Sequence, residues 1–236
     1  MYRMHLSGVG MTEADLMEES SGTEHLLRRT GMCFRGGKKS CLNHLLTATS
    51  PAVISINRGG GNTKGVLEAV SKRAKELSIG KVLIATCSGR TAFEALKILD
   101  KDIKIIAVSH VTGYAKPDFQ ELEEKDRGEL ESHGVKVLTC QHAFGGVGRG
   151  VRNKLDTYQV DEIMAHTLRV FGQGVKVAIE VTLMAADAGL VRTDEDVISV
   201  GGTAQGVDSA LVLKPANSAR FFDLKVREVI CKPAIF

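Results

Sequence analysis

Short apolar runs alternate with stretches of helical spacing from residue 52 onward. The most informative case is the apolar run at 82–85, which is followed by a small polar turn at 86–91 and then by apolar side chains at Ala92, Ala95 and Leu99. This spacing places the three side chains on one face of a helix. A strand, a turn and a helix are therefore expected in this order.

The same pattern recurs along the chain. Apolar runs predict strands at 53–56, 103–108, 135–139, 197–200, 209–213 and 226–231, and helical spacing predicts helices from Asn62 and over about 119–133. Strands separated by helices of this size favour a mostly parallel sheet with helices on its faces, which is a three-layer α/β sandwich. The turns that follow parallel strands then lie along one edge of the sheet.

The segment 175–183 is ambiguous by periodicity alone. Its apolar residues alternate as in a strand, with Lys176 and Glu180 between them, but the run continues through Ala188 and stops at Gly189. That length and that ending are typical of a buried helix.

Residues 1–50 show little periodicity, and we treat them as an N-terminal extension of uncertain order before a domain at 51–236. Met17 and Met32 are among several methionines in this region, so two interpretations stay open: a loosely packed extension, or translation that begins further downstream.

Composition excludes several classes of protein. No apolar run approaches the roughly 20 residues of a membrane span, and acidic residues such as Glu13 and Glu18 occupy the place of a signal-peptide core. The net charge is only +3 and aromatic residues make up 5%, which disfavours nucleic-acid binding. We therefore expect a soluble cytoplasmic protein without nucleic-acid or membrane partners; a homo-oligomer is left open.

The turn after the second strand is the leading candidate for chemistry. Ser88, Gly89, Arg90 and Thr91 stand at the start of the predicted helix, where free amides and the helix dipole favour an anion. We interpret this turn as a phosphate-binding site. Ser88 as a simple N-cap, and Arg90 directed into solvent, are the structural alternatives.

Other polar residues are expected at the same edge of the sheet. Candidate ligand contacts are His110, Thr112, Gly113, His142, Gly201 and Gly202, joined by Asn62 and Thr63, for which ordinary helix capping is an equal alternative. Several polar groups at strand ends are more informative than any one of them, because open α/β sheets bind ligands there. Asp208 is expected to brace its turn.

Two further motifs are weak. The stretch G-G-V-G-R-G at 145–150 lacks the G-x-G-x-x-G spacing and no apolar helix is expected after it, so we favour a flexible loop over a dinucleotide site. Cys87 beside Arg90 predicts a lowered thiol pKa, but no partner base is evident; Cys140 near His142 is similar. The five cysteines show no C-x-x-C pattern, so no metal ligands are assigned and the catalytic residues are unknown.

The run T-C-S-G-R-T-A at 86–92, followed by I-K-I-I-A-V-S at 103–109, resembles the C-terminal domain of pyruvate kinase, where a similar turn seats the phosphate of a sugar bisphosphate. A closer resemblance is to stand-alone archaeal and bacterial pyruvate kinase alpha/beta domain proteins. It rests on N-T at 62–63, S-H-V-T-G at 109–113, A-A-D-A-G at 185–189, V-G-G at 200–202 and G-V-D at 206–208, and covers about residues 52–233.

This resemblance implies binding of a phosphorylated small molecule, with flavin mononucleotide (FMN) as the cofactor suggested by the stand-alone family. It implies no pyruvate kinase activity, since that chemistry belongs to a barrel domain. The alternatives are a flavin-dependent enzyme of unknown reaction, with His110 or His142 as acid or base, and an interaction domain without a ligand.

Overall fold

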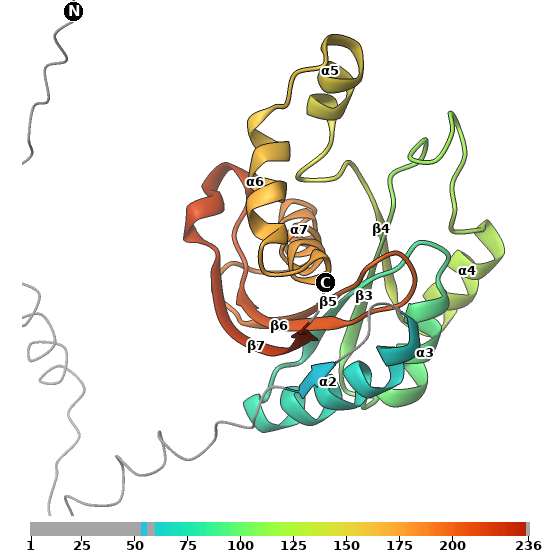
Figure 1. The fold of residues 1–236 in the computed structure, drawn as a ribbon. Helices are drawn as coiled ribbons and strands as arrows, with labels where there is room; N and C mark the ends of the chain where they lie inside the picture. Colours follow the sequence, from blue (N-terminus) through green and yellow to red (C-terminus); the bar gives the residue numbers. More distant parts are fainter. Residues whose placement is uncertain (1–52, 56–59, 235–236) are drawn as a thin grey trace, which may run out of the picture. The chain divides into compact units, whose positions relative to one another are not determined.

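The computed structural model describes residues 53–55 and 60–234 of the chain (Figure 1). The predictions for residues 1–50 lie outside this described part. The predicted first strand is present as β1 (Val53–Ser55), and a short 3-10 turn, η1 (Gly60–Asn62), precedes the first long helix.

One seven-stranded sheet organises the described residues, with the strand order β1-β7-β6-β5-β2-β3-β4. The strands after β1 are β2 (Lys81–Ala85), β3 (Lys104–Ser109), β4 (Lys136–Thr139), β5 (Val197–Gly201), β6 (Ser209–Lys214) and β7 (Lys225–Pro233). Strands β5, β2, β3 and β4 are parallel to one another, and β1 is parallel to β7, whereas β6 runs antiparallel to both of its neighbours. The sheet is therefore mostly parallel, as predicted.

Alternate strand residues point to opposite faces of the sheet, and both faces are buried. In β2, Val82 and Ile84 join one hydrophobic cluster, whereas Leu83 between them joins a second cluster on the other side. All three side chains are fully buried. Such continuous apolar strands are expected where helices cover a parallel sheet on both faces.

Three helices belong to the first face: α2 (Thr63–Leu77), α3 (Arg90–Ile98) and α4 (Glu124–Ser132). In the view of Figure 1, α2 and α3 lie below the sheet and α4 lies to its right. Helix α3 buries Ala92 and Ala95 as the spacing predicted.

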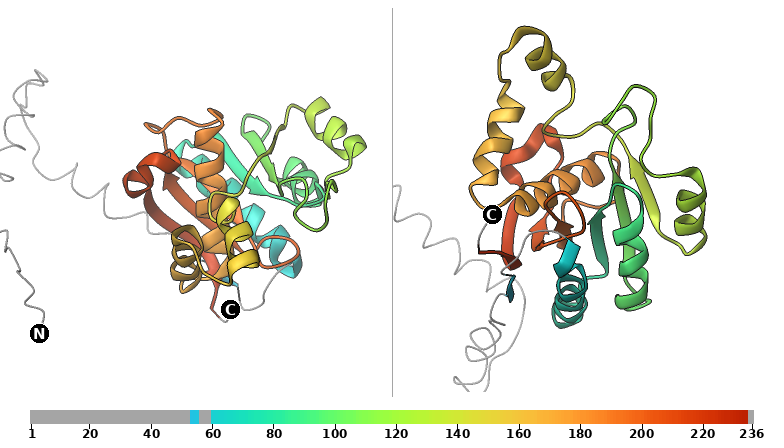
Figure 2. Two further views of the ribbon diagram at one scale, coloured as in Figure 1. Left: turned by 90° about the horizontal axis from the view of Figure 1, so that it is seen from above. Right: turned by 45° about the vertical axis from the view of Figure 1, so that its right-hand side comes forward.

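The second face is covered by α7 (Gln173–Asp187), which contacts β5, β6, β2 and β3. The ambiguous segment is thus helical, as predicted, and its middle is buried almost completely. Helix α6 (Val160–Arg169) packs on α7, and α5 (Val147–Leu155) packs on α6. This pair extends from α7 away from the sheet, and a 3-10 segment, η2 (Ser218–Asp223), packs against α7 (Figures 1 and 2). Helix, sheet and helix form the expected three layers.

Two sequence predictions are wrong in detail. The helix expected from about residue 119 begins only at Glu124, because Gln120 makes local hydrogen bonds that hold the chain in a turn: its Nε2 donates to the His110 carbonyl and its Oε1 accepts the Leu122 amide. The glycine-rich stretch at 145–150 is not all loop, because α5 starts at Val147. Val147, Val151 and Leu155 recur every four residues in α5, but none of the residues of this helix is buried.

Within the described residues, no helix is long and apolar enough to cross a membrane.

Candidate functional site

A cavity of about 640 Å³ opens at the carboxyl ends of β2 and β3. Its walls come from the turn after β2, the segment after β3, one face of α7 and the loop after β5. This is the place where the strand order reverses, between β2 and β5, and the volume falls in the usual range for small-molecule sites.

Six of the sequence-predicted residues line this cavity: Ser88, Arg90, Thr91, His110, His142 and Gly202. They come from four segments that are far apart in the sequence and meet at one edge of the sheet, as the parallel topology required. Ser88 and Arg90 are exposed, whereas Thr91 is buried.

The other six predicted residues do not line the cavity. Thr112 and Gly113 are exposed beyond it, and Thr63 is buried and accepts a hydrogen bond from the Val207 amide at 3.2 Å. Gly201 is packed against α7, where a Cβ atom would lie 2.3 Å from the Gly174 carbonyl oxygen. Asn62 takes the N-cap position of α2 without a side-chain capping bond, and Gly89 takes that of α3.

The geometry at the start of α3 favours the binding of an anion. Gly89 has a φ of 86° and lies against Leu122, so the turn needs a residue without a side chain. Because Gly89 is the N-cap, Ser88 is not the cap residue, contrary to the structural alternative. The first turn of α3 contains no acidic residue, and its free amides and dipole favour negative charge.

Basic side chains outnumber acidic ones around the cavity. The basic lining residues are Arg90, Arg149, Arg169 and Lys176, and the acidic ones are Glu121 and Glu180. The Arg90 Nη2 lies 3.4 Å from the Gln205 Oε1, and the buried Nε of Arg149 has no hydrogen-bond partner among the described residues. The excess of positive charge favours an anionic ligand.

Lys176 and Glu180 form a buried ion pair on the cavity face of α7. Burial lowers the pKa of the Lys176 ammonium group, and the neighbouring Glu180 carboxylate opposes this shift. Two charged residues at i and i+4 in an apolar helix were visible in the sequence, and they are the signal that could have placed α7 at the site.

Aromatic rings form another part of the wall. Tyr114 stacks on His142 with ring centroids 5.2 Å apart and lies 4.2 Å from the His110 ring. The guanidinium of Arg149 sits 4.9 Å above the Tyr114 ring. Burial lowers the pKa of His142 to about 4, so this imidazole is neutral at neutral pH. Sequence reasoning missed Tyr114, because it follows the strand by five residues and has no motif around it.

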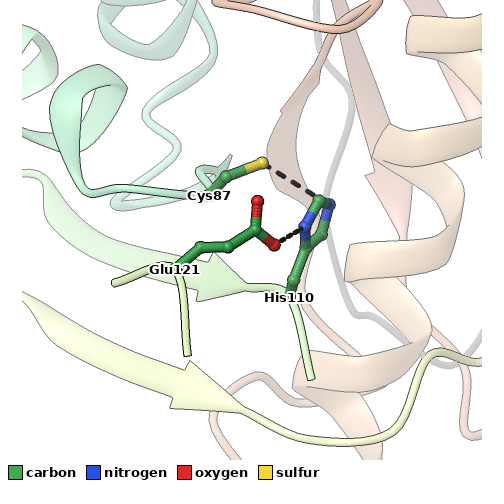
Figure 3. A group of neighbouring side chains, drawn as sticks. All are labelled: Cys87, His110 and Glu121. Carbon is green, nitrogen blue, oxygen red and sulfur yellow. Dashed lines mark hydrogen bonds and ion pairs between the residues drawn. The ribbon is translucent and has the colours of Figure 1, made fainter. Parts of the chain in front are cut away.

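Cys87, His110 and Glu121 meet at the cavity wall (Figure 3). The Cys87 Sγ lies 3.4 Å from the His110 Nε2, and the His110 Nδ1 lies 2.5 Å from the Glu121 Oε2. The prediction of a lowered Cys87 pKa is wrong: burial, with a smaller contribution from the Glu121 charge, raises this pKa to about 11.

These three side chains are also of metal-ligating types, and their ligand atoms lie within 4.8 Å of one another. The sequence pattern did not assign them, because they come from three separate segments. An ion held by all three would have to replace the direct bond between His110 and Glu121.

Asp208 braces its turn as expected. Its Oδ2 accepts the Thr203 amide and its Oδ1 accepts the Ser209 hydroxyl, both inside the protein. This fixes the loop that brings Gly202 and Gln205 to the cavity.

An open, mostly parallel three-layer α/β domain with a basic cavity at the carboxyl ends of its strands defines the class of this protein. The sequence matches the family described as pyruvate kinase, alpha/beta domain, over residues 64–213. This match covers more than half of the chain, and the protein belongs to that family. The described residues form an open sheet and contain no catalytic barrel.

Proposed function

We propose that the cavity binds a phosphorylated small molecule, and that FMN is the ligand. The observation that carries this proposal is that Ser88, Arg90 and Thr91, at the start of α3, line a cavity in which basic side chains are in excess. The amides and the dipole at the start of a helix favour an anion.

The rest of the cavity suits a planar ring. The rings of Tyr114 and His142 both line it, and His142 is neutral at neutral pH. Arg149 over Tyr114 adds a cation that a second anionic or carbonyl group could meet. A phosphate at one end and an aromatic ring system at the other describe a mononucleotide.

The proposal does not include pyruvate kinase activity. That reaction belongs to the barrel domain of pyruvate kinase, and the described residues supply an open sheet in its place. Membership in the alpha/beta domain family supports ligand binding rather than that chemistry.

Calorimetric titration with FMN and with riboflavin tests the proposal, because the two ligands share the ring system and differ in the phosphate. FMN should bind more tightly than riboflavin by about tenfold or more, as expected for charged hydrogen bonds to the phosphate. Equal affinities would show that the turn before α3 does not bind the phosphate. If neither ligand bound, flavin would be excluded as the ligand.

The alternative is a flavin-dependent enzyme. It is favoured by His110 and His142, whose rings both line the cavity 5.4 Å apart and could move a proton near a bound ring. Purified protein that stays colourless after incubation with FMN would count against this alternative. Native mass spectrometry that finds no bound small molecule would favour an interaction domain instead.

A further inference from the structure

The His110 imidazole contacts both Cys87 and Glu121, each through a different ring nitrogen. Glu121 contacts Nδ1 and Cys87 contacts Nε2, so the two ring nitrogens serve different partners (Figure 3). With the Nδ1 proton donated to the carboxylate, Nε2 keeps a lone pair that can accept the proton of the nearby thiol. This is the order of groups in a nucleophile, a base and an orienting acid.

The same geometry disfavours a metal centre. The ligand atoms of the three side chains lie within 4.8 Å of one another, but the His110 Nδ1 is already hydrogen-bonded to the Glu121 carboxylate. The bond between His110 and Glu121 would have to break before both could contact one ion.

We propose that Cys87 is a nucleophile for acyl transfer, with His110 as its general base and Glu121 as the residue that positions the imidazole. All three side chains line the cavity and are only half-buried, so a substrate can reach the thiol. Arg90, Arg149 and Arg169 line the same cavity and favour an acyl ester or thioester that carries an anionic group. This substrate class rests on the proposed phosphate site, whereas the triad does not.

The steps balance without a further reactant. His110 Nε2 takes the thiol proton as Sγ bonds to the acyl carbon; the bond to the leaving group then breaks, and the leaving group takes that proton from His110. Water completes the cycle: His110 takes a proton from it, the oxygen attacks the thioester carbon, and Sγ leaves with the proton. The high pKa of Cys87 agrees with this route, since a thiol that is protonated at rest needs a base during attack.

The orientation of Glu121 depends on a turn, which is present where the sequence predicted the start of a helix. Gln120 donates to the His110 carbonyl and to the Thr112 hydroxyl, which ties the turn to the segment after β3. Glu121 is therefore held beside His110 and is not part of α4.

The test uses the whole chain and p-nitrophenyl acetate, an activated ester without a phosphate. We expect a burst of p-nitrophenol equivalent to the protein and an acetyl group on Cys87 by peptide mass spectrometry. His110→Gln should slow acylation about 10²- to 10⁴-fold, as for loss of a general base. The acylation rate of Glu121→Gln should lie between the rates of His110→Gln and the unmodified chain. The solvent isotope effect on acylation should be lost in His110→Gln.

Cys140→Ala is the matched control, because Cys140 is another half-buried thiol and does not line the cavity. Its burst should equal that of the unmodified chain. A burst that survives in Cys87→Ala, or an acetyl group that maps to another residue of the unmodified chain, would overturn the proposal even if a variant failed to fold. Because the probe has no phosphate, this result is independent of whether FMN binds.

Discussion

Lys176 and Glu180 lie one turn apart on α7 and form an ion pair whose side chains are only 7% and 5% exposed. Glu180 also accepts the Phe144 amide at 3.0 Å, which ties α7 to the segment after β4. A buried charge is costly unless it is paired and hydrogen-bonded, and each of these residues meets that condition through the other. The pair therefore holds one wall of the cavity in place.

Removal of one partner should be more damaging than removal of both. Lys176→Met leaves the Glu180 carboxylate buried without its cation and should lower the free energy of unfolding by about 3–5 kcal/mol. The double variant Lys176→Met/Glu180→Gln keeps an acceptor for the Phe144 amide and should lose less than Lys176→Met alone. Urea denaturation measures both. Additive losses in a double-mutant cycle would show that the two side chains are not coupled.

Arg90→Ala should weaken the binding of FMN by about 1.5–3 kcal/mol, because a charged hydrogen bond to the phosphate is lost. Riboflavin should bind this variant and the unmodified chain alike. Isothermal titration calorimetry with both ligands measures the difference. Arg192→Ala is the control, since Arg192 is exposed, paired with Asp194 and placed before the amino end of β5, away from the cavity. Unchanged FMN affinity in Arg90→Ala would show that Arg90 does not contact the ligand.

His142 should make stability depend on pH. Its pKa falls from an ordinary value of 6.5 to about 4 in the folded protein, so the unfolded chain takes up a proton first as the pH decreases. The contribution of this residue to stability is complete above pH 6.5 and is lost as the pH falls toward 4.

Because the imidazole keeps partial contact with solvent, we expect a loss of about 1–2 kcal/mol from this residue. Urea unfolding at a series of pH values measures it, and His142→Gln should flatten the curve in this window. Equal curves for His142→Gln and the unmodified chain would contradict a buried neutral imidazole.

Gly201→Ala should destabilise the fold by about 1–3 kcal/mol, because the added Cβ would lie 2.3 Å from the Gly174 carbonyl and 2.8 Å from the Ala178 amide nitrogen. Gly150→Ala is the matched control: Gly150 lies inside α5 with nothing within 4 Å of an added Cβ. This change should stabilise by about 0.5–1 kcal/mol through helix propensity. Thermal unfolding of the two variants compares them directly, and a neutral Gly201→Ala would show that α7 can move away from β5.

Local periodicity was enough for the strands, for the helices α2, α3 and α7, and for the edge of the sheet at which the candidate site lies. The helices α5 and α6 were not predicted. The apolar run of β2, the polar turn and the helical spacing of α3 each report on a short window of sequence, and the parallel arrangement then brings Ser88, His110 and His142 to one edge of the sheet. The turn at 119–123 was not predicted, because Gln120 reaches back to His110 and Thr112 across the chain.

The sequence by itself determined the α/β class, the order of the strands and the polar turn at the start of α3, because each depends on neighbours a few residues apart. Only the tertiary structure decided that Glu121 meets His110, that His110 meets Cys87, and that Lys176 and Glu180 face the same cavity. Those contacts join separate segments, and the protonation of Cys87 and His142 follows from burial that no local pattern records.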